Sequence, residues 1–89
     1  MIVKYSPSFI KILKKVNVRV RNQFKRKVFI FSKNPADPQL RNHPLRGAYL
    51  GKRSIDITAD WRAIYEEIYE GDDVVLYFIA IGIHRQLYK

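Results

Sequence analysis

The stretch SIDITADWRAIYEEIYEGDDVVLYFIAI, residues 54–81, decides the fold class. Polar and apolar residues alternate over residues 54–58, and residues 61–69 are rich in aromatic and β-branched side chains. Gly71-Asp72 then leads into residues 74–81, an almost continuous apolar run. Alternation with a period of two predicts half-buried strands, and a long apolar run predicts a central strand. We therefore expect a three-stranded antiparallel meander.

The residues before this stretch follow a helical period instead. Residues 2–5 form a short β-branched run, and Ser6-Pro7 has the pattern of a helix N-cap. We expect one helix ending near Val16-Asn17, a second from about Val18 to Ser32, and a loop to about Gly47. With a short tail from His84 to Lys89, the order is strand, two helices and meander. This is an α+β fold with both helices packed on one face of the sheet.

Length and composition limit the function. The 89 residues form one small domain, residues 1–89, in which any active site must be a surface groove. The chain has no cysteine, so disulfides, thiolate zinc sites and cysteine nucleophiles are excluded. Nucleotide-binding glycine motifs are absent from the sequence, and two histidines alone do not make a metal site. We expect neither a cofactor nor a metal.

The charge is concentrated in the first part of the chain. Ten Lys or Arg residues precede Asp37, the first acidic residue, and the net charge is +9. A basic region of this kind favours a polyanion such as RNA or the ribosome, although an acidic protein segment fits the same charge. Because no secretory segment or run of about 18 apolar residues is present, we expect a cytoplasmic protein without a membrane partner.

Candidate residues for chemistry lie at the ends of the expected elements. His43 precedes the meander and His84 follows its last strand, and histidine suits proton transfer near neutral pH. Asp56 alternates with two apolar residues, so it faces away from the core, toward solvent or a groove. The turn pair Asp60-Trp61 is another candidate, although a turn aspartate and a core tryptophan explain it as well. Three arginines near these positions are candidate phosphate ligands or simple surface ion pairs: Arg53, Arg62 and Arg85.

Four segments form a distinctive combination: HPLRG at 43–47, GKRSIDI at 51–57, DWRAIY at 60–65 and IGIHRQLY at 81–88. Together they resemble the RelE/ParE toxin superfamily, and among its branches the YafQ-like mRNA interferases most of all. The resemblance implies a toxin of a type II toxin–antitoxin pair. Such a toxin cleaves messenger RNA in the ribosomal A site without a metal and is silenced by a cognate antitoxin.

The resemblance also implies roles for single residues. RNA cleavage by the 2′-OH needs a base, an acid for the leaving oxygen and cations on the phosphate. By position in the family motifs, we expect His84 as general acid and His43 or Asp60 as base. Trp61 and Tyr88 match the aromatic positions that contact the substrate. The three arginines named above are expected to stabilise the phosphate.

One position departs from the YafQ-like pattern. Asp56 stands where those enzymes usually carry a histidine, and a carboxylate there acts as a base or weakens the activity. Two other functions therefore stay open. One is a ParE-type inhibitor of DNA gyrase, which needs no nuclease histidines, and the other is an inert RNA-binding relic of the fold.

Overall fold

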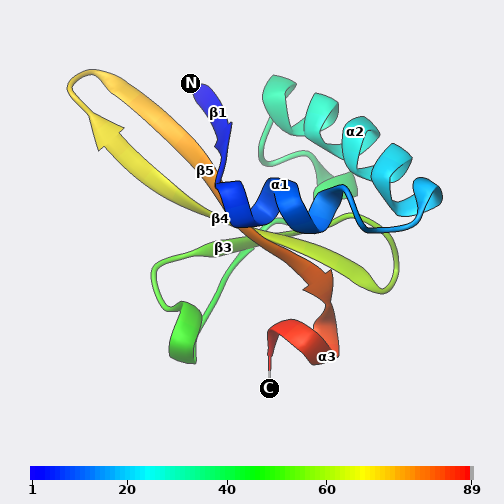
Figure 1. Cartoon of the computed structure of the whole chain (residues 1–89). Helices are drawn as coiled ribbons and strands as arrows, with labels where there is room; N and C mark the ends of the chain where they lie inside the picture. Colours follow the sequence, from blue (N-terminus) through cyan, green and yellow to red (C-terminus); the bar gives the residue numbers. More distant parts are fainter. Residues whose placement is uncertain (89) are drawn as a thin grey trace.

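The computed structural model describes residues 1–88, so Lys89, the last residue of the expected tail, lies outside the described residues. A strand and two helices come first, and a long hairpin and a short helix come last (Figure 1). The elements are β1 (Ile2–Tyr5), α1 (Pro7–Leu13), α2 (Val18–Lys33), η1 (Pro38–Leu40), β2 (His43–Pro44), η2 (Gly47–Tyr49), β3 (Arg53–Asp56), β4 (Trp61–Glu70), β5 (Asp73–Ile83) and α3 (His84–Leu87).

Side-chain caps determine where the first two helices begin. The Ser6 hydroxyl accepts the Phe9 N–H at 3.0 Å, and the Asn17 Oδ1 accepts the Val20 N–H at 3.0 Å. The first helix ends at Leu13, earlier than the expected Val16-Asn17. Asn17 must be extended to cap α2, so the chain leaves the helical conformation in the turn before it.

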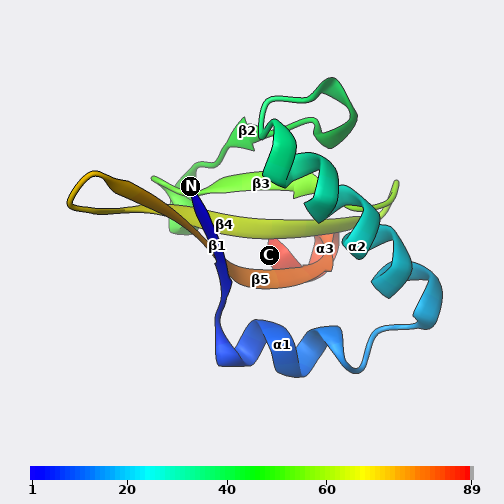
Figure 2. The same ribbon diagram turned by 90° about the horizontal axis from the view of Figure 1, so that it is seen from above.

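The sheet has five strands in the order β1-β5-β4-β3-β2 (Figure 2). β3, β4 and β5 form the expected antiparallel meander, and β1 pairs with β5 in parallel. The expected loop before the meander contains a short strand that the sequence pattern does not predict. This strand, β2, has only two residues, with His43 opposite Ser54 and Pro44 opposite Arg53.

The two faces of the sheet are covered differently. Ile55, Ala63 and Ile81 stand in one row across β3, β4 and β5 and are buried under α1 and α2, as expected. The ring of Phe78 is central to this core, with five aromatic rings at centroid distances of 5.3–5.8 Å. On the opposite side lie α3 and the η2 loop (Figures 1 and 2).

A close backbone approach seats α3 on the sheet. Gly82 of β5 is buried, and a Cβ at this position would lie 3.3 Å from the Leu87 side chain and 3.1 Å from the Gln86 Oε1. A residue without a side chain therefore lets α3 rest directly on the strand. Leu45 and Ile64 are buried outside the main core, so this face has a small apolar cover of its own. The rest of the face stays open beside it.

Candidate active site

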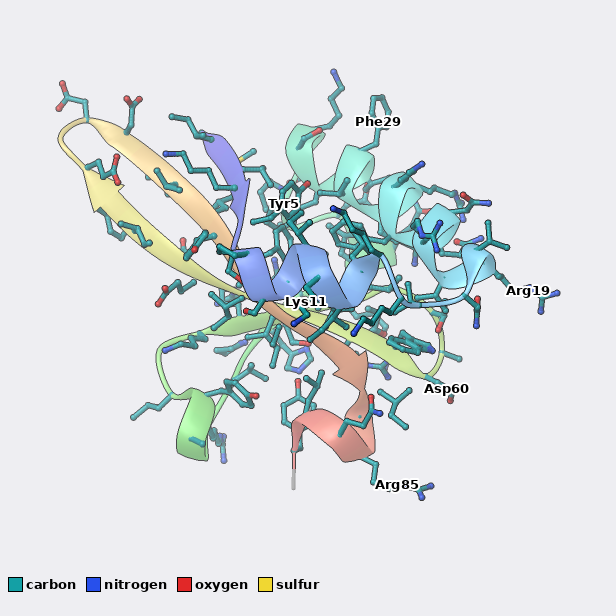
Figure 3. All side chains as sticks on the ribbon, in the orientation of Figure 1. Tyr5, Lys11, Arg19, Phe29, Asp60 and Arg85 are labelled. Carbon is teal, nitrogen blue, oxygen red and sulfur yellow. The ribbon has the colours of Figure 1, made fainter. Side chains whose placement is uncertain are left out.

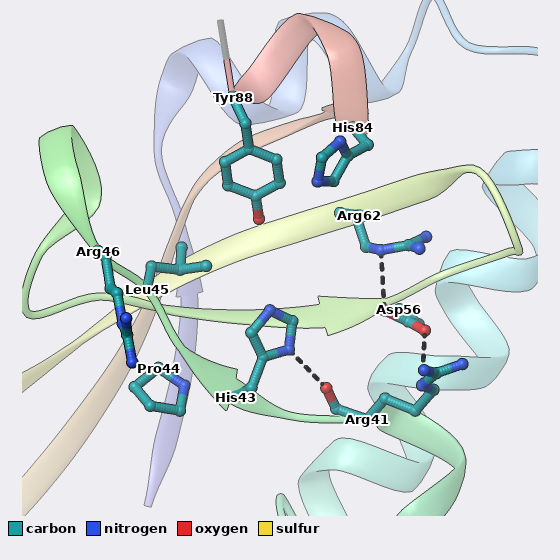
Figure 4. Close-up of a pocket in the computed structure, with 9 residues that line it drawn as sticks. All are labelled: Arg41, His43, Pro44, Leu45, Arg46, Asp56, Arg62, His84 and Tyr88. Atoms are coloured by element: carbon teal, nitrogen blue, oxygen red, sulfur yellow. Dashed lines mark hydrogen bonds and ion pairs between the residues drawn. The ribbon is translucent and has the colours of Figure 1, made fainter.

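The open part of this face contains a groove of about 490 Å³ (Figure 4). We call it the histidine groove. It is lined by Arg41, His43, Pro44, Leu45, Arg46, Asp56, Arg62, His84 and Tyr88. The register explains why distant residues meet here, because Asp56, Arg62 and Gly82 stand in one row across β3, β4 and β5. This row alternates with the core row, so its side chains point to the opposite face.

His43 enters the groove from the edge strand β2, with its ring directed toward His84 and Tyr88 (Figure 4). Its Nδ1 lies 2.9 Å from the Arg41 carbonyl oxygen. A carbonyl oxygen only accepts, so Nδ1 carries the proton and donates it. In the neutral ring the Nε2 lone pair is therefore available as a base.

Arg41 makes this arrangement possible through its backbone. Its φ of 47° and ψ of 43° put it in the left-handed region, which costs a non-glycine residue about 1–2 kcal/mol. The reversal at Arg41 brings its carbonyl within reach of His43, two residues later. The same residue thus bends the chain and selects the tautomer of the histidine.

His84 is placed by the junction between β5 and α3. Its backbone N–H donates to the Asp60 carbonyl at 3.3 Å, which ties the junction to the turn between β3 and β4. The His84 ring lies against the Tyr88 ring with centroids 4.5 Å apart, and Tyr88 meets Tyr49 edge-on at 6.1 Å. The Tyr88 hydroxyl is buried in the groove wall and has no hydrogen-bond partner within residues 1–88. These tilted and edge-on ring contacts hold the imidazole at the groove.

Asp56 and Arg62 form an ion pair at the floor of the groove. Arg62 Nε lies 2.9 Å from Asp56 Oδ1, and Arg41 Nε lies 3.6 Å from Asp56 Oδ2. The Asp56 and Arg62 side chains are only 13% and 19% exposed. Arg62 Nη1 also donates to the carbonyls of Thr58, Ala59 and Trp61 at 2.9–3.1 Å. These bonds make Arg62 a support of the turn, which differs from the phosphate ligand expected from the sequence.

Four of the expected site residues lie outside the groove. Asp60, Trp61 and Arg85 line a separate hollow of about 530 Å³, which shares His84 with the groove. Figure 3 shows the Asp60 and Arg85 side chains at the outer edge of the molecule. Asp60 does not line the groove because it sits on the turn beyond the strand ends. The structure thus brings the two histidines to one groove without Asp60, the expected alternative to His43 as base.

Arg53 is the fourth of these residues and faces the helix side of the sheet. Its Nε donates to Asn42 Oδ1 at 2.8 Å, and Asn42 Nδ2 donates to the Tyr65 hydroxyl at 2.8 Å. Burial is the main effect on Tyr65 and raises the pKa of its hydroxyl above the usual value. This network anchors the residue next to His43, so Arg53 positions the chain around the site without facing the groove.

Two arginines of the groove were not among the candidates from the sequence. Arg41 and Arg46 flank His43 on either side, and both are exposed. Arg46 lies inside the HPLRG segment that carried the resemblance, so that motif was a usable signal. Arg41 has no such signal, because its role depends on a backbone conformation. Three arginines and one carboxylate give the groove a net positive charge.

Comparison with known proteins identifies the family. The model of the ParE toxin of the type II toxin–antitoxin system parDE matches residues 3–88. The chain therefore belongs to the ParE toxin family, within the RelE/ParE superfamily of type II toxins. A search of curated proteins gave no match.

Solved structures of related toxins share the fold. YafQ from Escherichia coli is 26% identical over 98% of this chain and 97% of its own, with a TM-score of 0.76. A YoeB/ParE toxin from Agrobacterium tumefaciens is 21% identical over 94% of this chain and 99% of its own, with a TM-score of 0.75. The toxin of the E. coli DinJ–YafQ toxin–antitoxin complex is 27% identical over 98% of this chain and 96% of its own, with a TM-score of 0.70. Within the described part of the chain, no helix has the length and apolarity to cross a membrane.

Proposed function

We propose that this toxin is a ribosome-dependent endoribonuclease that cleaves messenger RNA in the A site. The observation that carries the proposal is the convergence of His43 and His84 on one basic groove. Two imidazoles facing one space are suited to move two protons around a single phosphate. The likeness to YafQ over nearly the whole chain supports the same activity, which the resemblance to YafQ-like interferases implies.

The proposed mechanism gives each ring one proton transfer. His43 Nε2 takes the proton of the 2′-OH, whose oxygen attacks the phosphorus and forms a 2′,3′-cyclic phosphate. His84, as imidazolium, donates a proton to the departing 5′ oxygen. Arg46 and Arg41 face the charge that develops on the phosphate. Arg41 approaches Asp56 only at 3.6 Å and is largely exposed, whereas Arg62 is held at 2.9 Å by Asp56 and by the turn carbonyls. After the step the two histidines have exchanged protonation states and must be reset by water.

The test is messenger RNA cleavage in a reconstituted translation system, with and without ribosomes, mapped to the nucleotide. We expect cuts within the A-site codon that require ribosomes. His84→Ala and His43→Ala should each reduce the cleavage rate by about 10²–10⁴-fold, the usual contribution of a positioned acid or base. Asp60→Asn is the matched control, because its side chain lies outside the groove, and it should cleave normally. Unchanged cleavage by His84→Ala would remove His84 as the acid.

Inhibition of DNA gyrase is the second candidate function, and a specific observation favours it. The family model that matches residues 3–88 is that of ParE toxins, and gyrase inhibition is the activity that a resemblance to ParE implies. A supercoiling assay with purified gyrase separates the two functions. If the parent does not cleave messenger RNA and the His43→Ala/His84→Ala variant still inhibits gyrase, gyrase inhibition would replace nuclease activity as the proposed function. RNA binding with neither activity would indicate an inert relic.

We further propose that a cognate antitoxin covers this toxin. Related toxins were crystallised with their antitoxins, namely DinJ–YafQ, RelE–RelB from Pyrococcus horikoshii and RelBE2 from Mycobacterium tuberculosis. The ten basic residues before Asp37 give an acidic segment a favourable surface. Co-purification of the chain with the product of an adjacent gene, followed by loss of toxicity on co-expression, tests this pairing.

A further inference from the structure

A second hollow, of about 450 Å³, lies beside the histidine groove, between α2 and the turn after β3. We call it the α2 hollow. Its cations are Arg19, Arg26 and Lys27 of α2 together with Arg41. Arg41 and Asp56 line both cavities. The two cavities therefore adjoin at the Arg41–Asp56 ion pair.

The helical period places the α2 cations on one face of the helix. Arg19, Gln23, Arg26 and Lys27 are spaced i, i+4, i+7 and i+8, which points them all toward the hollow. At 1.5 Å per residue, they cover about 12 Å along the helix. Arg19 stands at the outer end of α2 (Figure 3). The cations form a row that leads away from the histidine groove.

The three cations that α2 contributes, Arg19, Arg26 and Lys27, have no carboxylate partner in residues 1–88. Arg26 and Lys27 contact only neutral oxygens of Gln39, at 3.5 Å and 3.3 Å. The one carboxylate that lines the hollow, Asp56, is already paired with Arg62 at 2.9 Å. The hollow therefore carries an uncompensated positive charge next to the groove.

We propose that the α2 hollow binds the sugar–phosphate backbone of the single-stranded RNA whose scissile phosphate lies in the histidine groove. This inference rests on the proposed function, since it extends the same site. Guanidinium and ammonium groups in a row neutralise successive phosphates, and the Gln23 amide can donate to a phosphate or accept from a 2′-OH.

The lining of the hollow favours RNA over an acidic protein segment. A segment that folds on binding needs apolar anchors to offset its ordering entropy. The apolar residues that line the hollow, Ile57 and Ala59, offer no large exposed anchor, because Ile57 is 1% exposed and Ala59 carries a single methyl group. The exposed apolar residues of α2, Val18 and Phe29, lie outside the hollow. The hollow also adjoins the histidine groove at Arg41 and Asp56, so an extended RNA strand can reach both cavities, whereas a helical segment on the outer face of α2 would not.

The test is binding of a fluorescent ten-nucleotide RNA in which every 2′-OH is methylated. This probe lacks the nucleophile, so its binding is measured apart from cleavage. The variant is Arg19→Gln/Arg26→Gln. The control is Lys11→Gln/Lys25→Gln, which makes the same charge change at exposed residues of α1 and α2 outside both cavities. Thermal unfolding checks that both variants keep the fold.

We expect the hollow variant to bind about ten-fold more weakly at 50 mM salt, and the control to bind within two-fold of the parent. For the hollow variant, the slope of log affinity against log salt should be shallower than that of the parent by about 1.4, the value for two phosphate contacts on a single strand. Equal affinity of the variant and the control would overturn the proposal. So would a variant that loses affinity for an acidic peptide of glutamate and leucine but keeps its affinity for RNA.

Binding of the RNA probe and cleavage of messenger RNA test the α2 hollow and the proposed function separately. A toxin that cleaves messenger RNA but binds the probe equally well in both variants keeps its function and loses this site. A chain that binds the probe through Arg19 and Arg26 but does not cleave keeps the site and loses the nuclease activity.

Discussion

Replacement of Arg62 by Gln tests whether this residue supports the turn or binds substrate. Arg62 donates to Asp56 at 2.9 Å and to three turn carbonyls at 2.9–3.1 Å, and both side chains of the ion pair are largely buried. A hydrogen bond to a charged partner contributes about 1.5–3 kcal/mol, and removal of one member of a buried pair costs about 3–5 kcal/mol. Because Arg41 still faces Asp56 at 3.6 Å, we expect the Arg62→Gln variant to lose about 2–4 kcal/mol of its free energy of unfolding.

The assay is urea unfolding followed by fluorescence of Trp61, the single tryptophan, which adjoins Arg62. With a slope of about 1 kcal/mol per molar urea, the midpoint should fall by about 2–4 M. Asp56→Asn and the double variant complete a cycle, which should give a coupling energy of about 1–2 kcal/mol between the two side chains. A midpoint within 0.5 M of the parent, about 0.5 kcal/mol, together with a large loss of RNA affinity would refute the structural role of Arg62.

Three further outcomes follow from the core and from the seat of α3. Gly82→Ala brings a methyl group to 3.3 Å from Leu87, so α3 should shift and the rate of messenger RNA cleavage should fall more than ten-fold. Adding Leu87→Ala to this variant should restore part of the cleavage rate. An unchanged rate in Gly82→Ala would show that the position of α3 does not matter. Burial raises the pKa of the Tyr5 and Tyr65 hydroxyls, so their contribution to stability is complete below pH 10 and is lost as the pH rises through the raised pKa. Urea midpoints measured at pH 8–11 should therefore fall on the alkaline side. The fall should be smaller in the Tyr65→Phe variant. Phe78→Ala removes a fully buried ring at the centre of the aromatic core, for an expected loss of about 3–5 kcal/mol in urea unfolding, and a loss below 1 kcal/mol would contradict the packing described.

The sequence predicted the elements whose signals are local. The two helices were found from their caps and period, and the meander was found from its alternation and its apolar run. Strand β2 was missed because two residues, one of them proline, show no alternation. The parallel pairing of β1 with β5 could not be predicted either, since a short apolar run does not specify its partner.

The candidate site was predicted unevenly for the same reason. His43 and His84 could be named because histidine is rare here and both lie at element ends. The direction of Asp56 followed from the alternation, and the register confirms that it faces away from Ile55. Asp60 was grouped with them through its motif, but a motif does not show which way a turn side chain points. The role of Arg41 depends on a left-handed backbone that no pattern marks.

The pairing of β1 with β5 has a consequence for how the toxin is made. Ile2 lies opposite Val75, so strands that are neighbours in the sheet are more than 70 residues apart along the chain. Helices α1 and α2 leave the ribosome before β3, β4 and β5, the strands that bury their apolar faces. Closing so long a loop is slow and requires most of the chain. The histidine groove needs β2 through α3, so it cannot form until the chain through α3 has left the ribosome.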